Sequence, residues 1–213
     1  MSEAVAPQVV AIPNGSFGEN TFLLVDAATR AAVVIDPGEE YGRILAAIRH
    51  RQLNVQAIWL THGHVDHIWG VDAVRAATGA AVWLHPGDRD WYDGFADQCR
   101  HFGFAACAPL APPDHPLADG DILSFSAWRF EVRHVPGHSP GHVAFTGHGL
   151  CFSGDVLFAG SIGRTDLIGG DHQQLLTSIR TRLLSLPDET RVFTGHGPET
   201  TIGAERRSNP YLR

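Results

Sequence analysis

Three histidines and one aspartate lie within six positions of the segment 60–70. They are His62, His64, Asp66 and His67, in the spacing His-x-His-x-Asp-His. Imidazole nitrogen and carboxylate oxygen together suit zinc, iron or manganese. Four donors on one short turn exceed what a single tetrahedral ion needs once further ligands arrive from elsewhere, so the motif predicts two adjacent ions and, with them, hydrolysis. The alternative is a hydrogen-bonded turn that caps the next helix and binds no metal.

Three later segments place one more donor each beside small residues, directly after a predicted strand. His138 stands in Pro-Gly-His-Ser-Pro-Gly-His, Asp155 in Ser-Gly-Asp and His196 in Gly-His-Gly. Sites built on sheets collect at the carboxyl ends of strands, so we expect these loops to converge with the first motif. The sequence therefore predicts one composite metal site.

A competing motif, Gly-x-Ser-x-Gly at 137–141, matches the nucleophile elbow of serine hydrolases. That elbow requires the residue after the serine to donate its backbone N–H to the oxyanion. Here that residue is Pro140, which has no N–H. We therefore interpret Ser139 as a turn residue rather than a nucleophile.

The composition of the 213-residue chain is that of an ordinary globular protein, with 44% hydrophobic and 18% charged residues. The net charge is -7 and the longest basic run is the pair Arg206-Arg207, which argues against a nucleic-acid partner. Apolar runs such as 31–35 are too short to span a membrane, and the first seven residues do not resemble a secretory signal. Three cysteines without a Cys-x-x-Cys pair fit neither a disulfide framework nor a zinc knuckle. We expect a cytoplasmic protein that acts on a small molecule.

The elements that must position these donors alternate between strands and helices. Apolar periodicity predicts helices over 39–53 and 68–78 and one that begins at Asp171. It predicts strands at 8–12, 21–25, 31–35, 55–60, 80–84, 122–125, 128–134, 143–145, 150–152 and 191–194. The fold class is α/β: two βα halves, about 1–92 and 119–213, form a single domain packed as a four-layer αββα sandwich. Between them we expect an irregular insertion at 93–118 with at most one short helical turn, acting as a lid or as a linker.

In the order and spacing of these motifs, the chain resembles the metallo-β-lactamase fold superfamily. The stretches Gly-Ser-Ile-Gly-Arg-Thr-Asp-Leu at 160–167 and Ala-Glu-Arg-Arg-Ser-Asn-Pro-Tyr at 204–211 are similar to its small glyoxalase II-like branch, the short hydroxyacylglutathione hydrolases. The resemblance implies that His62, His64 and His138 hold one metal, that Asp66, His67 and His196 hold a second, and that Asp155 bridges the two. Longer glyoxalase II enzymes bind glutathione through a helical C-terminal domain. Only 17 residues follow His196 here, so the substrate contacts are not assigned.

The expected function is hydrolysis of a thioester such as an S-acylglutathione by a metal-bridging hydroxide, with two divalent ions as cofactors. We expect zinc, with iron and manganese as alternatives. Asp66 would orient the hydroxide and accept its proton in a later step. A thiolate leaves without a strong general acid, because thiol pKa values lie near 8.5. We interpret Arg164 and Asp166 as a structural ion pair, and His142 as a residue that supports the ligands.

Three alternatives stay open. One is a lactonase. A second resembles the persulfide dioxygenases, which share Gly-Arg-Thr-Asp and the fold but use a single iron, here on His62, His138 and Asp155. A third is a metal-binding module without catalytic activity.

Overall fold

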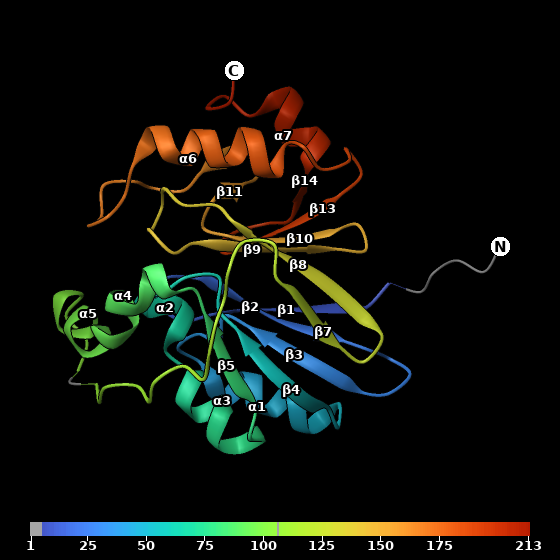
Figure 1. The fold of residues 1–213 in the computed structure, drawn as a ribbon. Helices are drawn as coiled ribbons and strands as arrows, with labels where there is room; N and C mark the ends of the chain where they lie inside the picture. Colours follow the sequence, from blue (N-terminus) through green and yellow to red (C-terminus); the bar gives the residue numbers. More distant parts are fainter. Residues whose placement is uncertain (1–5, 106) are drawn as a thin grey trace.

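The computed structural model describes residues 6–105 and 107–213, and its centre is a pair of six-stranded sheets packed face to face (Figure 1). The first sheet has the order β1-β2-β3-β4-β5-β6. Its strands are β1 (Gln8–Asn14), β2 (Glu19–Val25), β3 (Ala31–Ile35), β4 (Asn54–Trp59), β5 (Ala81–Leu84) and β6 (His115–Pro116). The first three are antiparallel, and β3 to β6 are parallel, so the carboxyl ends of β3, β4 and β5 lie at one edge.

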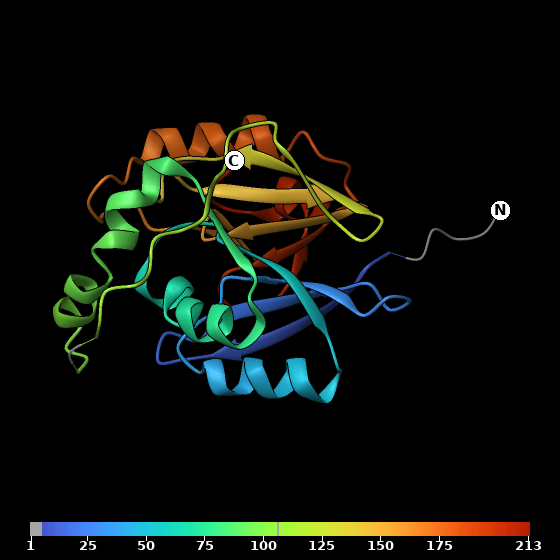
Figure 2. The ribbon, with the colours of Figure 1, turned by 60° about the horizontal axis from the view of Figure 1, so that its bottom comes forward.

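Helices connect the parallel strands, as parallel pairing requires. The helix α1 (Tyr41–His50) joins β3 to β4, and α2 (Val65–Ile68) with α3 (Val71–Thr78) joins β4 to β5. Figure 2 shows α1 and α3 side by side over the outer face of this sheet.

The second sheet has the order β14-β13-β10-β9-β8-β7. Its strands are β7 (Ile122–Phe125), β8 (Trp128–His134), β9 (Val143–Gly147), β10 (Leu150–Gly154), β13 (Arg191–Thr194) and β14 (Thr200–Thr201). Only β10 and β13 pair in parallel, and the helix α6 (His172–Ser178) with the π-helical turn η2 (Ile179–Leu183) connects them. The hairpin β11 (Leu157–Phe158) and β12 (Ser161–Ile162) precedes α6, and α7 (Ile202–Ser208) follows β14.

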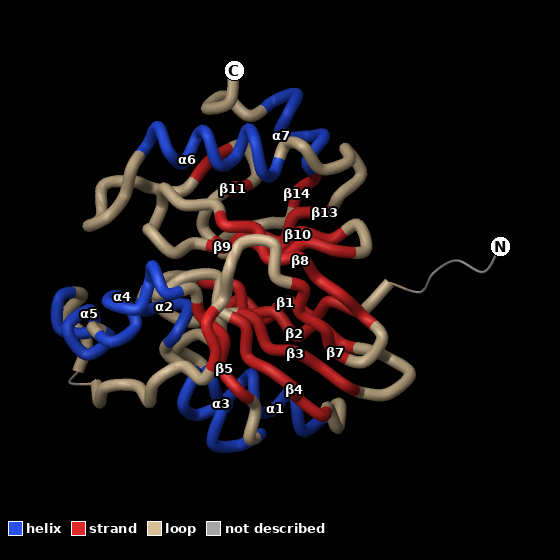
Figure 3. Tube along the Cα trace, viewed as in Figure 1, coloured by secondary structure: helices blue, strands red, loops and turns tan. Residues whose placement is uncertain are grey.

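Three separate apolar clusters lie between successive layers. Ile44 of α1 and Val74 of α3 belong to the cluster outside the first sheet. Trp59 belongs to the cluster between the sheets, where its ring contacts Phe145 at a centroid distance of 5.3 Å. A third cluster includes Leu175 of α6 and covers the outer face of the second sheet. Three buried interfaces separate four layers, which confirms the αββα sandwich (Figures 1 and 3).

The segment between the sheets differs from the irregular insertion predicted at 93–118. It follows the 3-10 turn η1 (Pro86–Asp88) and begins with the helix α4 (Arg89–Asp93). The helix α5 (Phe95–His101) lies inside the predicted insertion, as does the edge strand β6. The reason is apolar spacing: Tyr92, Phe95 and Cys99 are all buried and recur at helical intervals. These buried residues lie on both sides of residue 93, where the insertion was predicted to begin. Neither the segment before residue 93 nor the segment after it contains enough of them to predict a helix.

Two expectations from composition concern membranes and cysteines. Within 6–105 and 107–213, no helix has the length and apolar character needed to cross a bilayer. All three cysteines are free thiols, with Cys99 and Cys151 buried. The prediction about a secretory signal concerns mainly residues 1–5, which lie outside the described residues.

Candidate metal centre

Four loops, each at the carboxyl end of a strand, bring the predicted donors together. The loop after β4 runs into α2, and the other loops follow β8, β10 and β13. The seven side chains that they contribute are His62, His64, Asp66, His67, His138, Asp155 and His196. The convergence follows from strand direction, because each loop leaves the carboxyl end of its strand.

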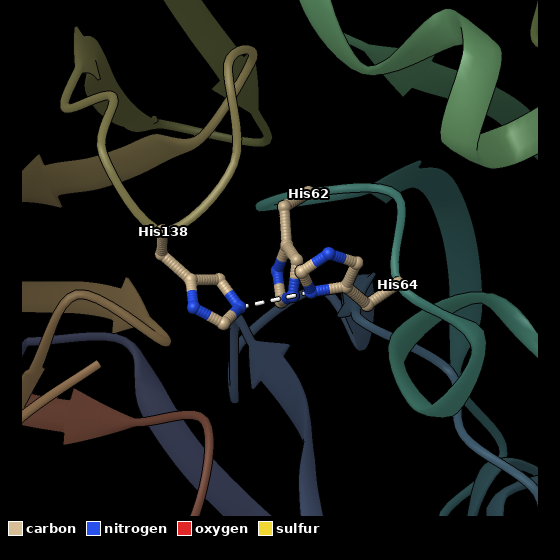
Figure 4. Close-up of side chains that lie close together, drawn as sticks. All are labelled: His62, His64 and His138. Atoms are coloured by element: carbon tan, nitrogen blue, oxygen red, sulfur yellow. Dashed lines mark hydrogen bonds between the residues drawn. The ribbon is translucent and has the colours of Figure 1, made fainter. Parts of the chain in front are cut away.

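The first group consists of His62, His64 and His138, and all three side chains are buried. One ligand atom from each lies within 4.8 Å of the others. Figure 4 shows the three rings pointing toward one another, with His64 Nδ1 at 2.9 Å from His138 Nε2. This contact joins the loop after β4 in the first sheet to the loop after β8 in the second.

The second group consists of Asp66, His67 and His196. Asp66 Oδ2 lies 3.2 Å from His196 Nε2 and 3.6 Å from His67 Nε2. The Asp155 carboxylate lies between the two groups. Its Oδ2 is 3.7 Å from His138 Nε2 in the first group and 3.4 Å from His196 Nε2 in the second, and its Oδ1 is 3.4 Å from His67 Nε2.

Hydrogen bonds on the far side of the rings orient several of these histidines. Nδ1 of His138 donates to the carbonyl of Arg164 at 2.8 Å, and Nδ1 of His196 lies 3.2 Å from the carbonyl of Phe17. Nδ1 of His67 lies 3.0 Å from Oδ2 of Asp36. Such contacts hold a proton on Nδ1 and make Nε2 the nitrogen available to a metal, the arrangement that metal-ligating histidines adopt.

The buried donors fit a metal ion. Among the described residues, no hydrogen-bond partner meets Nε2 of His62, His64 or His67, or Oδ1 of Asp155, although these atoms are buried. An unsatisfied buried polar atom costs about 1–3 kcal/mol, so four of them around one centre indicate a group that the protein binds there. Imidazoles with carboxylates form the donor set of zinc, iron and manganese.

The two groups differ in electrostatics. Burial lowers the pKa of His62 well below its usual range, and burial together with the neighbouring His138 lowers the pKa of His64 to about 3. Burial also disfavours the charged forms of His67 and His196. The carboxylates of Asp66 and Asp155 outweigh it, and they raise the pKa of His67 well above its usual range and that of His196 to about 10. His62 and His64 of the first group are thus neutral, whereas His67 and His196 of the second belong to a network of charges.

A cavity of about 1110 Å³ opens onto both groups. Trp91 of α4 and Phe102, which follows α5, line one side, and the loop that contains Arg164 and Asp166 lines the other. Arg164 Nε and Nη2 each donate to Asp166 at 2.7 Å, and both side chains are more than half exposed. The volume suits a ligand larger than a small acyl group alone.

The remaining predicted site residue, His142, contacts the centre without joining either group. Its Nε2 accepts a hydrogen bond from the backbone N–H of Asp155 at 3.0 Å, and its ring stacks on His62 at a centroid distance of 4.6 Å. Sequence reasoning missed Asp36 and Asp88. Asp36 follows β3 directly, so the rule that located the other loops could have found it, whereas Asp88 belongs to no recognisable motif.

The sequence profile of the metallo-beta-lactamase superfamily matches residues 15–196. The chain belongs to the metallo-beta-lactamase superfamily. Among its members, the hydroxyacylglutathione hydrolase GloC of Haemophilus influenzae is 40% identical over 204 residues, which cover 94% of this chain and 96% of that protein.

Solved structures of superfamily members agree with the fold. The crystal structure of BLEG-1 B3 metallo-beta-lactamase superposes with a TM-score of 0.91 at 41% identity, covering 96% of this chain and 99% of that one. TTHA1623 in a di-iron-bound form superposes with a TM-score of 0.87 at 44% identity, covering 96% and 100%. The chain is therefore a member of a metallo-hydrolase superfamily whose site has clusters of histidine and aspartate suited to divalent metals.

Proposed function

We propose that this protein is a metal-dependent hydrolase that cleaves a thioester such as an S-acylglutathione. The observation that supports it best is the position of Asp155, whose carboxylate lies between the two groups, with Oδ2 near His138 of the first and near His196 of the second. A shared carboxylate is what a two-ion hydrolytic site needs. The 40% identity to a hydroxyacylglutathione hydrolase supports the substrate class.

In this proposal, His62, His64 and His138 hold one ion, Asp66, His67 and His196 hold the other, and Asp155 is a ligand of both. Zinc is the proposed metal, and the di-iron form of TTHA1623 makes iron the main alternative. When bound, divalent ions supply Lewis-acid activation of water and of a carbonyl at neutral pH. Asp66 lines the cavity, so its carboxylate orients the attacking water and accepts a proton from it.

The charges along the cavity support a small thiol carrier over a phosphorylated one. The chain contains no lysine, so all 16 basic residues other than histidine are arginines. Arg164 is the single arginine among the described residues that line the cavity, and it is already paired with Asp166. One guanidinium suits one carboxylate, such as that of a short peptide thiol, but a nucleotide thiol with several phosphates would meet mostly carboxylates.

The test measures metal content together with turnover of four substrates: S-lactoylglutathione, lactoyl-coenzyme A, a simple lactone and glutathione persulfide. We expect two metals per chain and fastest cleavage of the glutathione thioester. One iron per chain with oxygen uptake on the persulfide would replace the hydrolase by an oxidoreductase. Faster turnover of the lactone would move the substrate class from thioesters to lactones, and no turnover in the metal-loaded protein would support a binding module.

A further inference from the structure

The carboxylate of Asp88 is completely buried between two loops that contain proposed metal ligands. Its Oδ2 accepts a hydrogen bond from the N–H of Gly63 at 2.9 Å and one from the hydroxyl of Ser139 at 2.6 Å. Its Oδ1 accepts from the N–H of Gly141 at 2.5 Å. Gly63 stands between His62 and His64, and Ser139 directly follows His138.

The backbones around this carboxylate pack too closely for side chains. A Cβ on Gly141 would lie 2.4 Å from the backbone nitrogen of Asp88, and one on Gly63 would lie 2.9 Å from its carbonyl oxygen. A Cβ on Gly87 would lie 2.9 Å from the Cα of Gly141. The resemblance of 137–141 to a nucleophile elbow therefore has a different explanation, because Ser139 and Gly141 both donate to Asp88.

These contacts join the two sheets beside the first group of histidines. The loop with His62 and His64 leaves the first sheet, the loop with His138 leaves the second, and Asp88 hydrogen-bonds to both. We propose that Asp88 is a positioning residue that fixes the separation of His64 from His138 and so sets the metal affinity of the three-histidine group. This inference rests on the proposed assignment of that group as metal ligands.

The second group does not depend on Asp88 in the same way. His67 is oriented by Asp36, and His196 by the carbonyl of Phe17. The proposal therefore predicts that one of two adjacent metal sites is weakened and the other is spared. A residue that only stabilised the fold would affect both.

Replacement of Asp88 by asparagine is a sharp test because an amide cannot reproduce the contacts. Each carboxylate oxygen accepts from a backbone N–H, Oδ2 from Gly63 and Oδ1 from Gly141. In either orientation, the NH₂ of an asparagine would point at one of these N–H groups, and two donors cannot bond. One loop is thereby released, although size and shape hardly change.

The experiment is a competition titration of metal-free protein with zinc against a chromophoric chelator, with cobalt spectra to distinguish the three-histidine site from the site that also contains Asp66. Outer-sphere substitutions typically reduce metal affinity about 10- to 100-fold, so Asp88→Asn should weaken the first site by that factor and leave the second within about 2-fold. Ser139→Ala removes one of the three hydrogen bonds and should show the same selectivity with a smaller loss. Asp114→Asn is the matched control, because Asp114 also accepts from a backbone N–H, that of Val82, but its contacts lie away from the ligand loops.

Equal weakening of both sites in Asp88→Asn, or unchanged affinity at both, would overturn the proposal. If Asp88→Asn does not fold, Ser139→Ala decides alone, and loss at both sites or at neither has the same meaning there. Failure of the proposed function is a separate result: a wild-type protein that binds two metals but cleaves no thioester refutes the substrate class and leaves the role of Asp88 intact.

Discussion

The two groups of donors share one loop and one carboxylate, yet they are opposite electrostatic environments. His62 and His64 are buried among other histidines, and burial keeps them neutral. His67 and His196 face the carboxylates of Asp66 and Asp155, and their pKa values are raised. Donors of a single motif, His62 to His67, therefore belong to two environments of different charge.

The difference originates in the backbone between His64 and Val65. His64 has extended dihedral angles, φ -74° and ψ 150°, and precedes the first residue of α2. Asp66 and His67 lie in that helix, so their side chains leave in directions different from those of His62 and His64. A single change from extended to helical backbone thus divides one motif between two groups of donors, and the carboxylate of Asp155 lies between these groups.

The largest effect should follow from removal of the residue common to both groups. Asp155→Ala deletes a donor that faces both groups, so we expect loss of at least one metal and a fall in turnover on the order of 10³-fold, as several kcal/mol of lost transition-state stabilisation implies. Metal analysis and turnover of S-lactoylglutathione measure this. Asp155→Asn serves as the isosteric control. An Asp155→Ala protein that binds two metals normally would show that the groups are independent.

Single deletions in each group should separate the two sites. His138→Ala removes a donor of the first group and His196→Ala one of the second, so each variant should lose one metal of a different site. Cobalt spectra distinguish them, because only the second group includes a carboxylate of its own, Asp66. Identical spectra for the two variants would mean that the comparison between the groups is wrong.

Metal uptake should release a proton from His196 in the second group and hardly any from His62 and His64 in the first. The raised pKa of His196, about 10, means that this imidazole is protonated in the metal-free protein at neutral pH, and a bound ion must displace that proton. Affinity at the second site should therefore rise with pH from neutrality to about 10. His64, with a pKa lowered to about 3, is neutral throughout this range. Calorimetric titration in buffers of different ionisation enthalpy counts the protons, and equal release at both sites would contradict the prediction.

The same shift affects the stability of the metal-free protein. A histidine whose pKa is raised in the folded state stabilises it fully below the ordinary value near 6.5, and this contribution is lost as pH rises through the folded value. Thermal unfolding of metal-free protein should thus show stability falling between about pH 6.5 and 10. His196→Ala should remove part of this dependence.

Sequence reasoning succeeded where local pattern and strand direction are sufficient. The strands around the centre and the helices α1, α3 and α6 follow from apolar periodicity, whereas α2, α4 and α5 were not predicted. The convergence of four loops follows from the carboxyl ends of strands. The assignment of donors to two groups came from family resemblance, because spacing alone does not show where α2 begins. The role of Asp88 could not be predicted from the sequence, because its three hydrogen-bond donors, Gly63, Ser139 and Gly141, come together only in the folded protein. Contacts between distant segments leave no periodic trace in the chain.

The smallest effect on stability should come from the exposed ion pair on the cavity rim. Arg164 and Asp166 have side-chain exposures of 58% and 68%, and pairs of this kind contribute about 0–1 kcal/mol. Arg164→Ala should therefore leave the melting temperature nearly unchanged. It keeps the backbone carbonyl that accepts from His138, so metal content should also be normal. Because the proposed function pairs this guanidinium with a carboxylate of the thiol carrier, KM for S-lactoylglutathione should rise several-fold while kcat is preserved. An unchanged KM would mean that Arg164 does not contact the substrate and that the two groups of donors act without it.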